Sequence, residues 1–264
     1  MKNWEKFESE SLLYIQKEFG NLATFVGVGS HDSTVSDIKV IKDGETVFFI
    51  ESKDSLAQCG QFVLEPDYEK RLFVYSQRNK SSYENARIIV EYMNAHFENY
   101  APKVNGEKYS QLDLNQKICF NWVKKYYREE KKCEYFITMY EGDFVISHIS
   151  NIDKYFEISA AYRRKTSGSC KPAKKNIPEI KRCLIKNGIV FRGLNNDTFE
   201  IDIVNKDVTF KLKGESYRYQ FTKIGEKFKI TRLSNTRNWN VIFTLHAKSP
   251  QRPEDIEMLK KDLK

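Results

Sequence analysis

The stretch SDIKVIKDGETVFFIESK, residues Ser36 to Lys53, decides the fold of the N-terminal part of the chain. Its pattern predicts a short strand over residues 38–41, a turn that contains Asp-Gly, and a longer strand over 46–53. The second strand is apolar at its centre and ends on Glu51 and Lys53. Charges at the end of a buried strand are costly unless they are paired or bind an ion, so they need an explanation.

Glu51 and Lys53 are two residues apart and therefore point to the same face of the strand. The hairpin returns Asp37 to the same region. Two carboxylates beside a lysine can hold Mg²⁺, neutralise charge on a phosphate and orient an attacking water. Asp37, Glu51 and Lys53 are therefore the candidate set for phosphodiester hydrolysis; the alternative is a surface ion pair at the end of the strand.

The length of the turn decides whether Asp37 faces this pair. A two-residue turn would place Asp37 opposite Ile50, on the other face from Glu51. A three-residue loop over residues 42–44 would place Asp37 opposite Phe49, and then both acids share a face. We predict the three-residue loop, or a bulge with the same effect.

Residues 4–19 predict an amphipathic helix whose apolar stripe contains an acid, Glu8. The apolar residues of this stripe are Trp4, Phe7, Ile15 and Phe19. A carboxylate on a buried face is costly unless it is paired or binds a cation. Glu8 is therefore a further candidate for the site, although a small error in helix phase explains it equally well.

The charge of the chain is divided unevenly. Residues 1–100 hold 11 Lys and Arg against 16 Asp and Glu, and the remainder holds 33 against 20. The segment 162–182 alone has 8 basic residues and a single acid, Glu179. A basic excess of this size favours a polyanion such as nucleic acid as the partner, although a solvated basic surface is the simpler explanation.

The five cysteines are odd in number and widely spaced, so they predict reduced side chains and neither disulfides nor a zinc site. No apolar run approaches membrane-spanning length, and the charged N-terminus does not resemble a signal peptide. We therefore expect a cytoplasmic protein that does not interact with membranes.

The predicted elements indicate an α+β protein with a mixed sheet flanked by helices. The order helix, hairpin, strand, helix covers about the first hundred residues, and short strands at close spacing follow from residue 188. We expect three domains: a catalytic domain over 1–105, a DNA-recognition domain over 106–185 and a β-rich DNA-binding domain over 186–264.

The motif Ser36-Asp37, followed after thirteen residues by Glu51-Ser52-Lys53, resembles the PD-(D/E)XK nuclease motif with Ser in place of Pro. Six stretches in matching order look like the HhaI-type restriction endonucleases and span residues 3 to about 248. They are STVSDI, FFIESK, QCGQFVL, FITMYEGDFVI, YRRKTSGS and LSNTRNWNVIF. This sequence departs from the motif that it resembles in two ways: Ser52 replaces an Ala, and the spacer between the two acids is two residues longer. Both departures concern the turn of the hairpin and leave the proposed site residues unchanged.

The resemblance implies a Mg²⁺-dependent type II restriction endonuclease that cuts duplex DNA at a short palindrome, with GCGC suspected. It implies a monomer that leaves 5′-phosphate and 3′-OH ends and a cognate methyltransferase that protects host DNA. Asp37 and Glu51 would ligate the metal, Lys53 would contact the attacking water and the scissile phosphate, and Glu8 would support the site or hold a second metal.

DNA contacts are expected mainly in one basic segment that contains a glycine, because Arg and Lys read guanine in the major groove. They contact phosphates even more often, so both roles remain open for each residue. Two glutamines after the catalytic strand and residues of a late turn are further candidates, although helix capping and turn chemistry explain these too. The full set is Ser36, Gln58, Gln61, Arg163, Arg164, Lys165, Ser167, Ser169, Lys171, Asn235 and Arg237.

Two other functions fit the same residues. A repair or junction nuclease would keep the catalytic set and recognise DNA shape. A DNA-binding protein that no longer cleaves is the third possibility, and the intact Asp37, Glu51 and Lys53 argue against it. The residues alone do not fix the recognition sequence, the cut position, the number of metal ions or the sensitivity to base methylation.

Overall fold

The structure is a computed structural model that describes residues 3–28, 35–101, 109–166, 172–195, 198–201, 208–213, 218–224, 227–233 and 237–264. For residues 3, 109, 164–166, 194–195, 201, 208–209, 222–224 and 237–238 it describes the backbone only.

The helices are α1 (Asn3–Phe19), α2 (Tyr83–Ala95), α3 (Phe97–Tyr100), α4 (Gln116–Lys125), the π-helix η1 (Tyr126–Glu130), the 3₁₀ turn η2 (Ile149–Asn151), α5 (Ile152–Tyr155), the 3₁₀ turn η3 (Lys174–Asn176), α6 (Ile177–Lys186) and α7 (Pro253–Leu263). The strands are β1 (Thr24–Gly27), β2 (Ile38–Lys42), β3 (Glu45–Ser52), β4 (Gln58–Asp67), β5 (Leu72–Tyr75), β6 (Tyr109–Leu112), β7 (Cys133–Tyr140), β8 (Asp143–His148), β9 (Phe156–Thr166), β10 (Phe191–Asn195), β11 (Thr198–Ile201), β12 (Val208–Lys211), β13 (Arg218–Ile224), β14 (Lys227–Leu233) and β15 (Arg237–Ala247). This mixture of helices and sheets confirms the α+β class.

The chain forms two compact units. Unit 1 consists of Met1–Arg163 and Trp239–Lys264, and unit 2 is the intervening Arg164–Asn238. These units do not divide at the predicted boundaries near residues 105 and 186, because sheet pairing joins distant parts of the chain. One sheet of unit 1 has the order β5-β4-β15-β9-β6 and so contains strands from all three predicted domains. The functional assignments of those three domains stay predictions.

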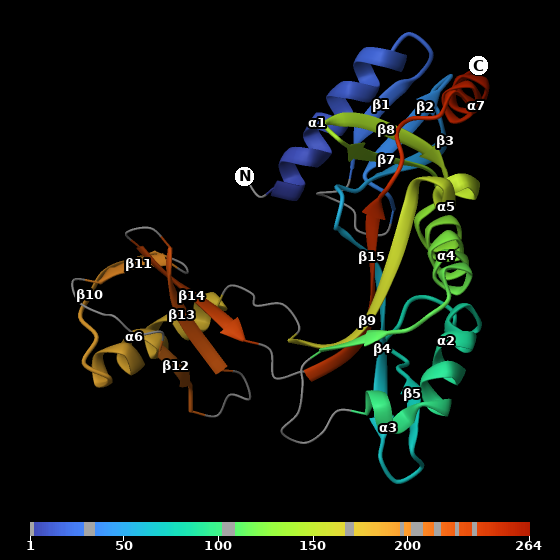
Figure 1. Cartoon of the computed structure of the whole chain (residues 1–264). Helices are drawn as coiled ribbons and strands as arrows, with labels where there is room; N and C mark the ends of the chain where they lie inside the picture. The colour runs from blue at the N-terminus through green and yellow to red at the C-terminus, as the bar shows by residue number, and fades with distance from the viewer. Residues whose placement is uncertain are drawn as a thin grey trace. The chain divides into compact units, whose positions relative to one another are not determined.

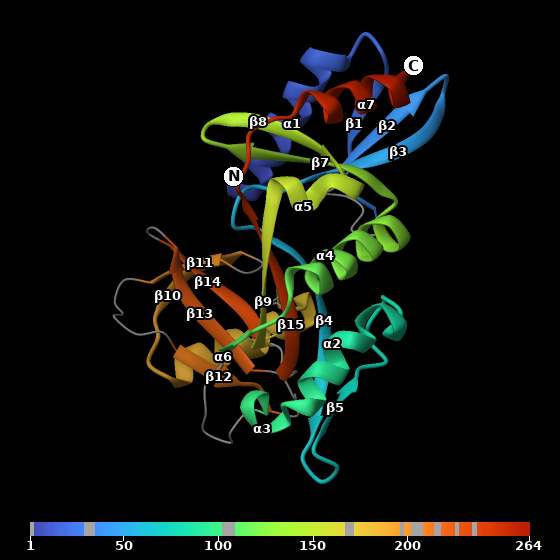
Figure 2. The ribbon, with the colours of Figure 1, turned by 45° about the vertical axis from the view of Figure 1, so that its right-hand side comes forward.

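The other sheet of unit 1 has the order β1-β2-β3-β7-β8 and carries the hairpin quoted above. Its strands pair antiparallel except β3 with β7, which pair parallel. Helices α1 and α7 lie beside this sheet in both views of the ribbon (Figures 1 and 2). Their buried side chains, among them Ile15 and Leu259, form one core with Ile38 and Ile50 of the sheet. Burying each such side chain contributes about 1.5–3 kcal/mol.

The hairpin has a two-residue turn, so the predicted three-residue loop is wrong. Lys42 pairs with Glu45, and Asp43 and Gly44 between them have φ of 52° and 84°. These left-handed conformations belong to the tight turn that Asp-Gly favours.

The predicted alternative, a bulge, is confirmed. Ile41 pairs with Thr46, whereas Val40 pairs with Phe48, so Val47 is the extra residue in β3. Beyond the bulge Ile38 pairs with Ile50, and the next position along places Asp37 opposite Glu51. The inserted residue therefore puts both acids on one face of the hairpin.

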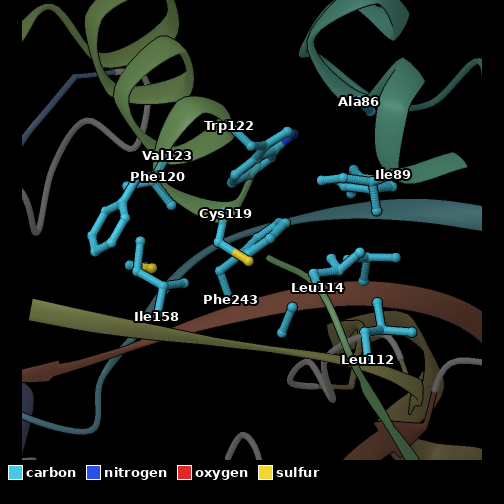
Figure 3. Packing of buried hydrophobic residues seen from close by; sticks show 14 of the residues in the cluster. Ala86, Ile89, Leu112, Leu114, Cys119, Phe120, Trp122, Val123, Ile158 and Phe243 are labelled. Atoms are coloured by element: carbon cyan, nitrogen blue, oxygen red, sulfur yellow. The ribbon is translucent and has the colours of Figure 1, made fainter. Parts of the chain in front are cut away.

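The sheet β5-β4-β15-β9-β6 packs one face against α2 and α4. Figure 3 shows the cluster, in which Trp122 and Cys119 of α4 meet Phe243 of β15 and Ile158 of β9. The rings of Trp122 and Phe243 are stacked with centroids 4.2 Å apart. A Cβ at Gly60 would lie 2.6 Å from the Trp122 ring, so this close approach requires glycine.

Unit 2 is a five-stranded antiparallel sheet of order β10-β11-β14-β13-β12 with α6 beside it. Its core joins Ile180 and Leu184 of α6 to Phe199, Tyr219 and Phe221 of the strands. The alternation predicted strands in this part of the chain, and the described strands confirm that prediction.

Several elements differ from the predictions. The sequence pattern from about Tyr83 to Tyr100 predicts one helix, but the structure has two, because α2 ends at His96, whose N–H bonds to the carbonyls of Asn94 and Met93. The basic segment from Arg163, with its Gly168, predicts a loop, yet it begins as strand: β9 pairs with β6 as far as Arg163 and runs to Thr166. Trp4 was placed on the buried stripe of the first helix, but its side chain is 47% exposed.

Candidate active site

Asp37, Glu51 and Lys53 meet where β3 ends. The Lys53 Nζ lies 2.5 Å from Glu51 Oε1 and 3.6 Å from Asp37 Oδ2. The backbone N–H of Ser52 donates to Asp37 Oδ2 at 3.0 Å, and this contact closes the end of the hairpin. Glu51 is only 5% exposed. The structure therefore brings the three predicted catalytic side chains together, and it excludes the alternative of a solvent-exposed surface ion pair.

Asp37 and Glu51 share one positively charged partner, the ammonium of Lys53. Burial and the charge of the nearby Glu51 raise the pKa of Asp37 to about 6, and the ammonium of Lys53 offsets only part of this rise. Burial and the carboxylate of Asp37 raise the pKa of Glu8 to about 7. Burial opposes the charge of Lys53, but Glu51 and Asp37 outweigh it and raise the pKa of its ammonium. Three carboxyl groups beside one lysine form a site with excess negative charge, which a divalent cation would neutralise.

Glu8 enters the site from α1. It lies on a cavity of about 450 Å³ that also reaches Lys53 and, from β4, Gln58. The other lining residues are Trp4, Phe7, Ser52, Asp54 and Ala57. On the adjacent turn of α1, the hydroxyl of Ser11 is 2.8 Å from that of Ser52 and fixes the helix to the end of β3. The position of Glu8 on the apolar stripe therefore brings its carboxylate within the electrostatic influence of Asp37, Lys53 and Glu51.

Tyr127 is a site residue that the sequence did not indicate. Its hydroxyl donates to Glu51 Oε1 at 3.2 Å, and the side chain is 2% exposed. The residue belongs to the π-helix η1, an irregular turn that is often found at functional sites. Its ring packs edge-on against Phe136, which pairs with Glu51 on the neighbouring strand. Nothing in the spacing of the Tyr-Tyr pair marks this contact.

The segment after η1 also fixes the hairpin. The backbone N–H of Ser36 donates to the carbonyl of Lys131, and the N–H of Phe49 donates to that of Lys132. These two bonds hold the strand ends that carry Asp37 and Glu51. The same short segment therefore positions both acids through its backbone and Glu51 through Tyr127.

The side chains fit a divalent metal ion of the magnesium type. Within the described ranges, no three His, Cys, Asp or Glu side chains lie close enough together to enclose a metal ion. Mg²⁺ usually takes only one or two protein carboxylates and completes its shell with waters and substrate phosphate. Asp37 and Glu51 form such a pair, and burial together with the charge of Glu51 raises the pKa of Asp37 to about 6, so a bound cation would favour its ionised form.

The glutamines predicted to contact DNA lie on β4, so the alternative that they cap a helix is wrong. Gln58 Nε2 donates to Gln61 Oε1 at 3.0 Å, and Gln58 lines the cavity beside Lys53. Ser36 is fully buried, which argues against a direct DNA contact by its side chain.

The basic candidates are only partly described. Arg163 is half-buried on β9, where it pairs with Tyr109. Arg164 and Lys165 continue β9 and Arg237 begins β15, but the structure describes only their backbone. Ser167, Ser169, Lys171 and Asn235 lie outside the described residues.

The whole chain is similar to a solved nuclease structure. HhaI endonuclease in complex with DNA superimposes on it with a TM-score of 0.81 and 31% sequence identity, over 99% of each chain. No family model matches the chain. No curated protein matches it with significance.

This likeness, together with the cluster of acids and lysine, defines the class of the protein as an endonuclease. More narrowly, the chain belongs to the family of HhaI-like restriction endonucleases. In the described residues, none of the helices has the length and apolar character that a membrane crossing requires.

Proposed function

We propose that this protein is a Mg²⁺-dependent type II restriction endonuclease of the PD-(D/E)XK class. It hydrolyses phosphodiester bonds of duplex DNA at a short palindrome, GCGC, and leaves 5′-phosphate and 3′-OH ends. The observation that carries the proposal is the convergence of Asp37, Glu51 and Lys53 in a chain that matches a restriction endonuclease over its whole length.

Each side chain has a definable role in this reaction. Asp37 and Glu51 would hold the metal ion, which supplies positive charge to the phosphate and lowers the pKa of a bound water. Lys53 keeps its proton, so its ammonium can donate to a phosphate oxygen or orient the attacking water. Tyr127 holds the carboxylate of Glu51 in place. Glu8, at the open side of the cluster, is placed to support the site or to receive a proton from solvent.

The charge of unit 2 supports DNA as the partner. Its 75 residues hold 18 Lys and Arg against 7 Asp and Glu. Contacts of Lys and Arg with phosphates supply most of the sequence-independent affinity for DNA. We propose that the protein acts as a monomer in the cytoplasm, beside a methyltransferase that protects host DNA.

Incubation with long duplex DNA and Mg²⁺ tests the proposal. Discrete, reproducible fragments indicate a restriction endonuclease. A smear, or nicking at branched structures, indicates a repair nuclease, and intact DNA that shifts on a gel indicates a binding protein.

Asp37→Ala is expected to abolish cleavage and to leave DNA binding largely intact. Asp67→Ala removes an acid from the β4–β5 hairpin and serves as the control, because among the described residues its carboxylate bonds to Lys70 and not to the acid cluster. Cleavage that survives Asp37→Ala would show that the catalytic assignment is wrong.

A further inference from the structure

The face of the sheet β5-β4-β15-β9-β6 that lies opposite the core carries a polar surface. Leu245 of β15 and Ile158 of β9 are buried in the core, whereas their neighbours His246 and Ser159 point to the other face. β15 and β9 are adjacent strands. Polar side chains of the two strands therefore meet on the face that does not pack against α2 and α4.

Ser159 and His246 form a hydrogen-bonded pair on this face. The Ser159 Oγ lies 2.8 Å from His246 Nε2, and both side chains are half-buried. A hydroxyl combines one donor with two acceptor lone pairs, and imidazole has a second ring nitrogen. The pair therefore holds its geometry and retains capacity to bind a ligand.

The pair lies in an open cavity of about 600 Å³ at the end of β6, where residues 111–116 run beside β9. Its polar lining includes Gln111 and Gln116 and two acids, Asp113 and Glu157. The side-chain amide of Gln116 bonds to the backbone N–H and C=O of Ile158, which fixes the wall of the cavity. Acids at its rim repel phosphate, so this cavity does not suit a DNA backbone. Carboxylates, hydroxyls and imidazole suit base edges, where a carboxylate accepts from the cytosine amino group.

This surface continues from the catalytic cavity. Gln58, which lines that cavity, pairs with Thr244 on β15, and Thr244 shares the polar face with His246. The N–H of Leu56 bonds to the carbonyl of Leu245, so the loop after Lys53 runs directly beside the same strand. Adjacent strands are about 4.8 Å apart, which places β9 roughly 10 Å from β4. That span is within the width of one major groove, about 12 Å.

We propose that the cavity around Ser159 and His246 is a base-reading subsite for the duplex that passes the catalytic cavity. It recognises the hydrogen-bonding edge of a base that carries an exocyclic amino group. This inference rests on the proposed function, because it assigns a base-pair preference to the same DNA that the acid cluster cuts.

Selection from a pool of randomised duplexes tests the proposal independently of cleavage. The full chain with Asp37→Asn binds the pool, and the bound DNA is sequenced. Adding Ser159→Ala or His246→Asn is expected to lower the preference about tenfold at one or two base-pair positions and to leave the other positions unchanged. The melting temperature of each variant shows whether it folds. If His246→Asn fails to fold, Ser159→Ala still tests the proposal, because it removes only a hydroxyl.

His96→Ala is the matched control, because His96 is exposed at the end of α2, away from this face. An unchanged preference in both variants, a uniform loss at every position, or a parent that selects no sequence would overturn the proposal. Failure of the proposed function would appear elsewhere, as an absence of cleavage by the unmodified protein with Mg²⁺.

Discussion

Unit 1 and unit 2 differ in where their charges lie and what surrounds them. Unit 1 holds 26 Lys and Arg against 29 Asp and Glu, yet it gathers one buried acid, Glu51, and two half-buried acids, Glu8 and Asp37, around Lys53. Unit 2 holds 18 against 7, and its described basic side chains are largely exposed. Buried charges set chemistry through local fields, whereas exposed charges of one sign set affinity for a polyanion. The proposed enzyme therefore separates cleavage from DNA attraction, and each half of this comparison can be tested alone.

The largest effect is expected at the buried cluster of unit 1. Glu51→Gln should lower the cleavage rate at saturating DNA by at least about 10³-fold, because a neutral amide is a poor ligand for Mg²⁺. Single-turnover cleavage measures the rate, and a gel shift should show affinity within about threefold of the unmodified protein. If DNA affinity falls by the same factor as the cleavage rate, the two units do not divide cleavage and DNA binding between them.

A smaller effect, on affinity alone, is expected in unit 2. Four exposed basic residues share one surface around α6 and β12: Arg182, Lys186, Lys211 and Lys213. Changing all four to Gln should weaken DNA binding about 10- to 100-fold and make it less sensitive to salt, because phosphate contacts release counterions. Binding is measured from 50 to 200 mM salt. The matched control changes Lys6, Lys17, Arg78 and Arg87 of unit 1 to Gln, and an equal effect there would contradict the prediction.

Tyr127→Phe tests whether the hydrogen bond from Tyr127 positions Glu51 in the buried cluster of unit 1. The change keeps the buried ring and removes the hydrogen bond to Glu51, so metal affinity should fall about tenfold while the fold persists. Calorimetric titration with Mn²⁺ in the absence of DNA gives the affinity. Tyr75→Phe is the control, since it removes a hydroxyl whose partner in the described part of the chain is Ser81. Equal Mn²⁺ affinity of Tyr127→Phe and the unmodified protein would remove the positioning role.

The smallest effect concerns stability against pH in the absence of metal. Burial raises the pKa of Asp37 to about 6 and that of Glu8 to about 7, above their ordinary values. Between about pH 4 and pH 7 the folded carboxyls keep protons that the unfolded chain has released. The free energy of unfolding should therefore fall with rising pH in this window, by on the order of 1–2 kcal/mol.

Thermal unfolding of the metal-free protein from pH 4.5 to 7.5 measures this dependence. Mg²⁺ at pH 7.5 should restore the melting temperature, and Asp37→Asn should flatten the pH profile. A metal-free profile that rises through this range would contradict the raised pKa values.

The sequence predicted those parts of the fold that depend on local patterns. Helix α1, the hairpin and the strands of unit 2 all have clear periodicity, and the structure confirms them. The packing of β15 beside β4 joins residues far apart in the chain, which no local pattern encodes. Helix α7 was not anticipated, although its Pro253 near the start is a typical helix signal.

The candidate site also contains residues that local sequence patterns predict and contacts that only the three-dimensional structure shows. Asp37, Glu51 and Lys53 have a spacing that sequence reasoning recognises, and the structure places them together. The contact of Tyr127 with Glu51 arises from a π-helix and a parallel strand pair, so it required three-dimensional structure. The Ser159–His246 pair likewise joins strands whose paired residues are 87 positions apart in the chain.

Because of the bulge at Val47, Asp37 and Glu51 share a face of the hairpin only when the number of residues between them is odd. Asp37 and Glu51 stand opposite each other, so every ladder pair added or removed between them changes the spacer by two residues and keeps both acids on one face. A change by one residue would turn Glu51 and Lys53 toward the core formed with α1. Across relatives, the hairpin should therefore vary in length in even steps, and single-residue insertions or deletions there should be rarer than substitutions.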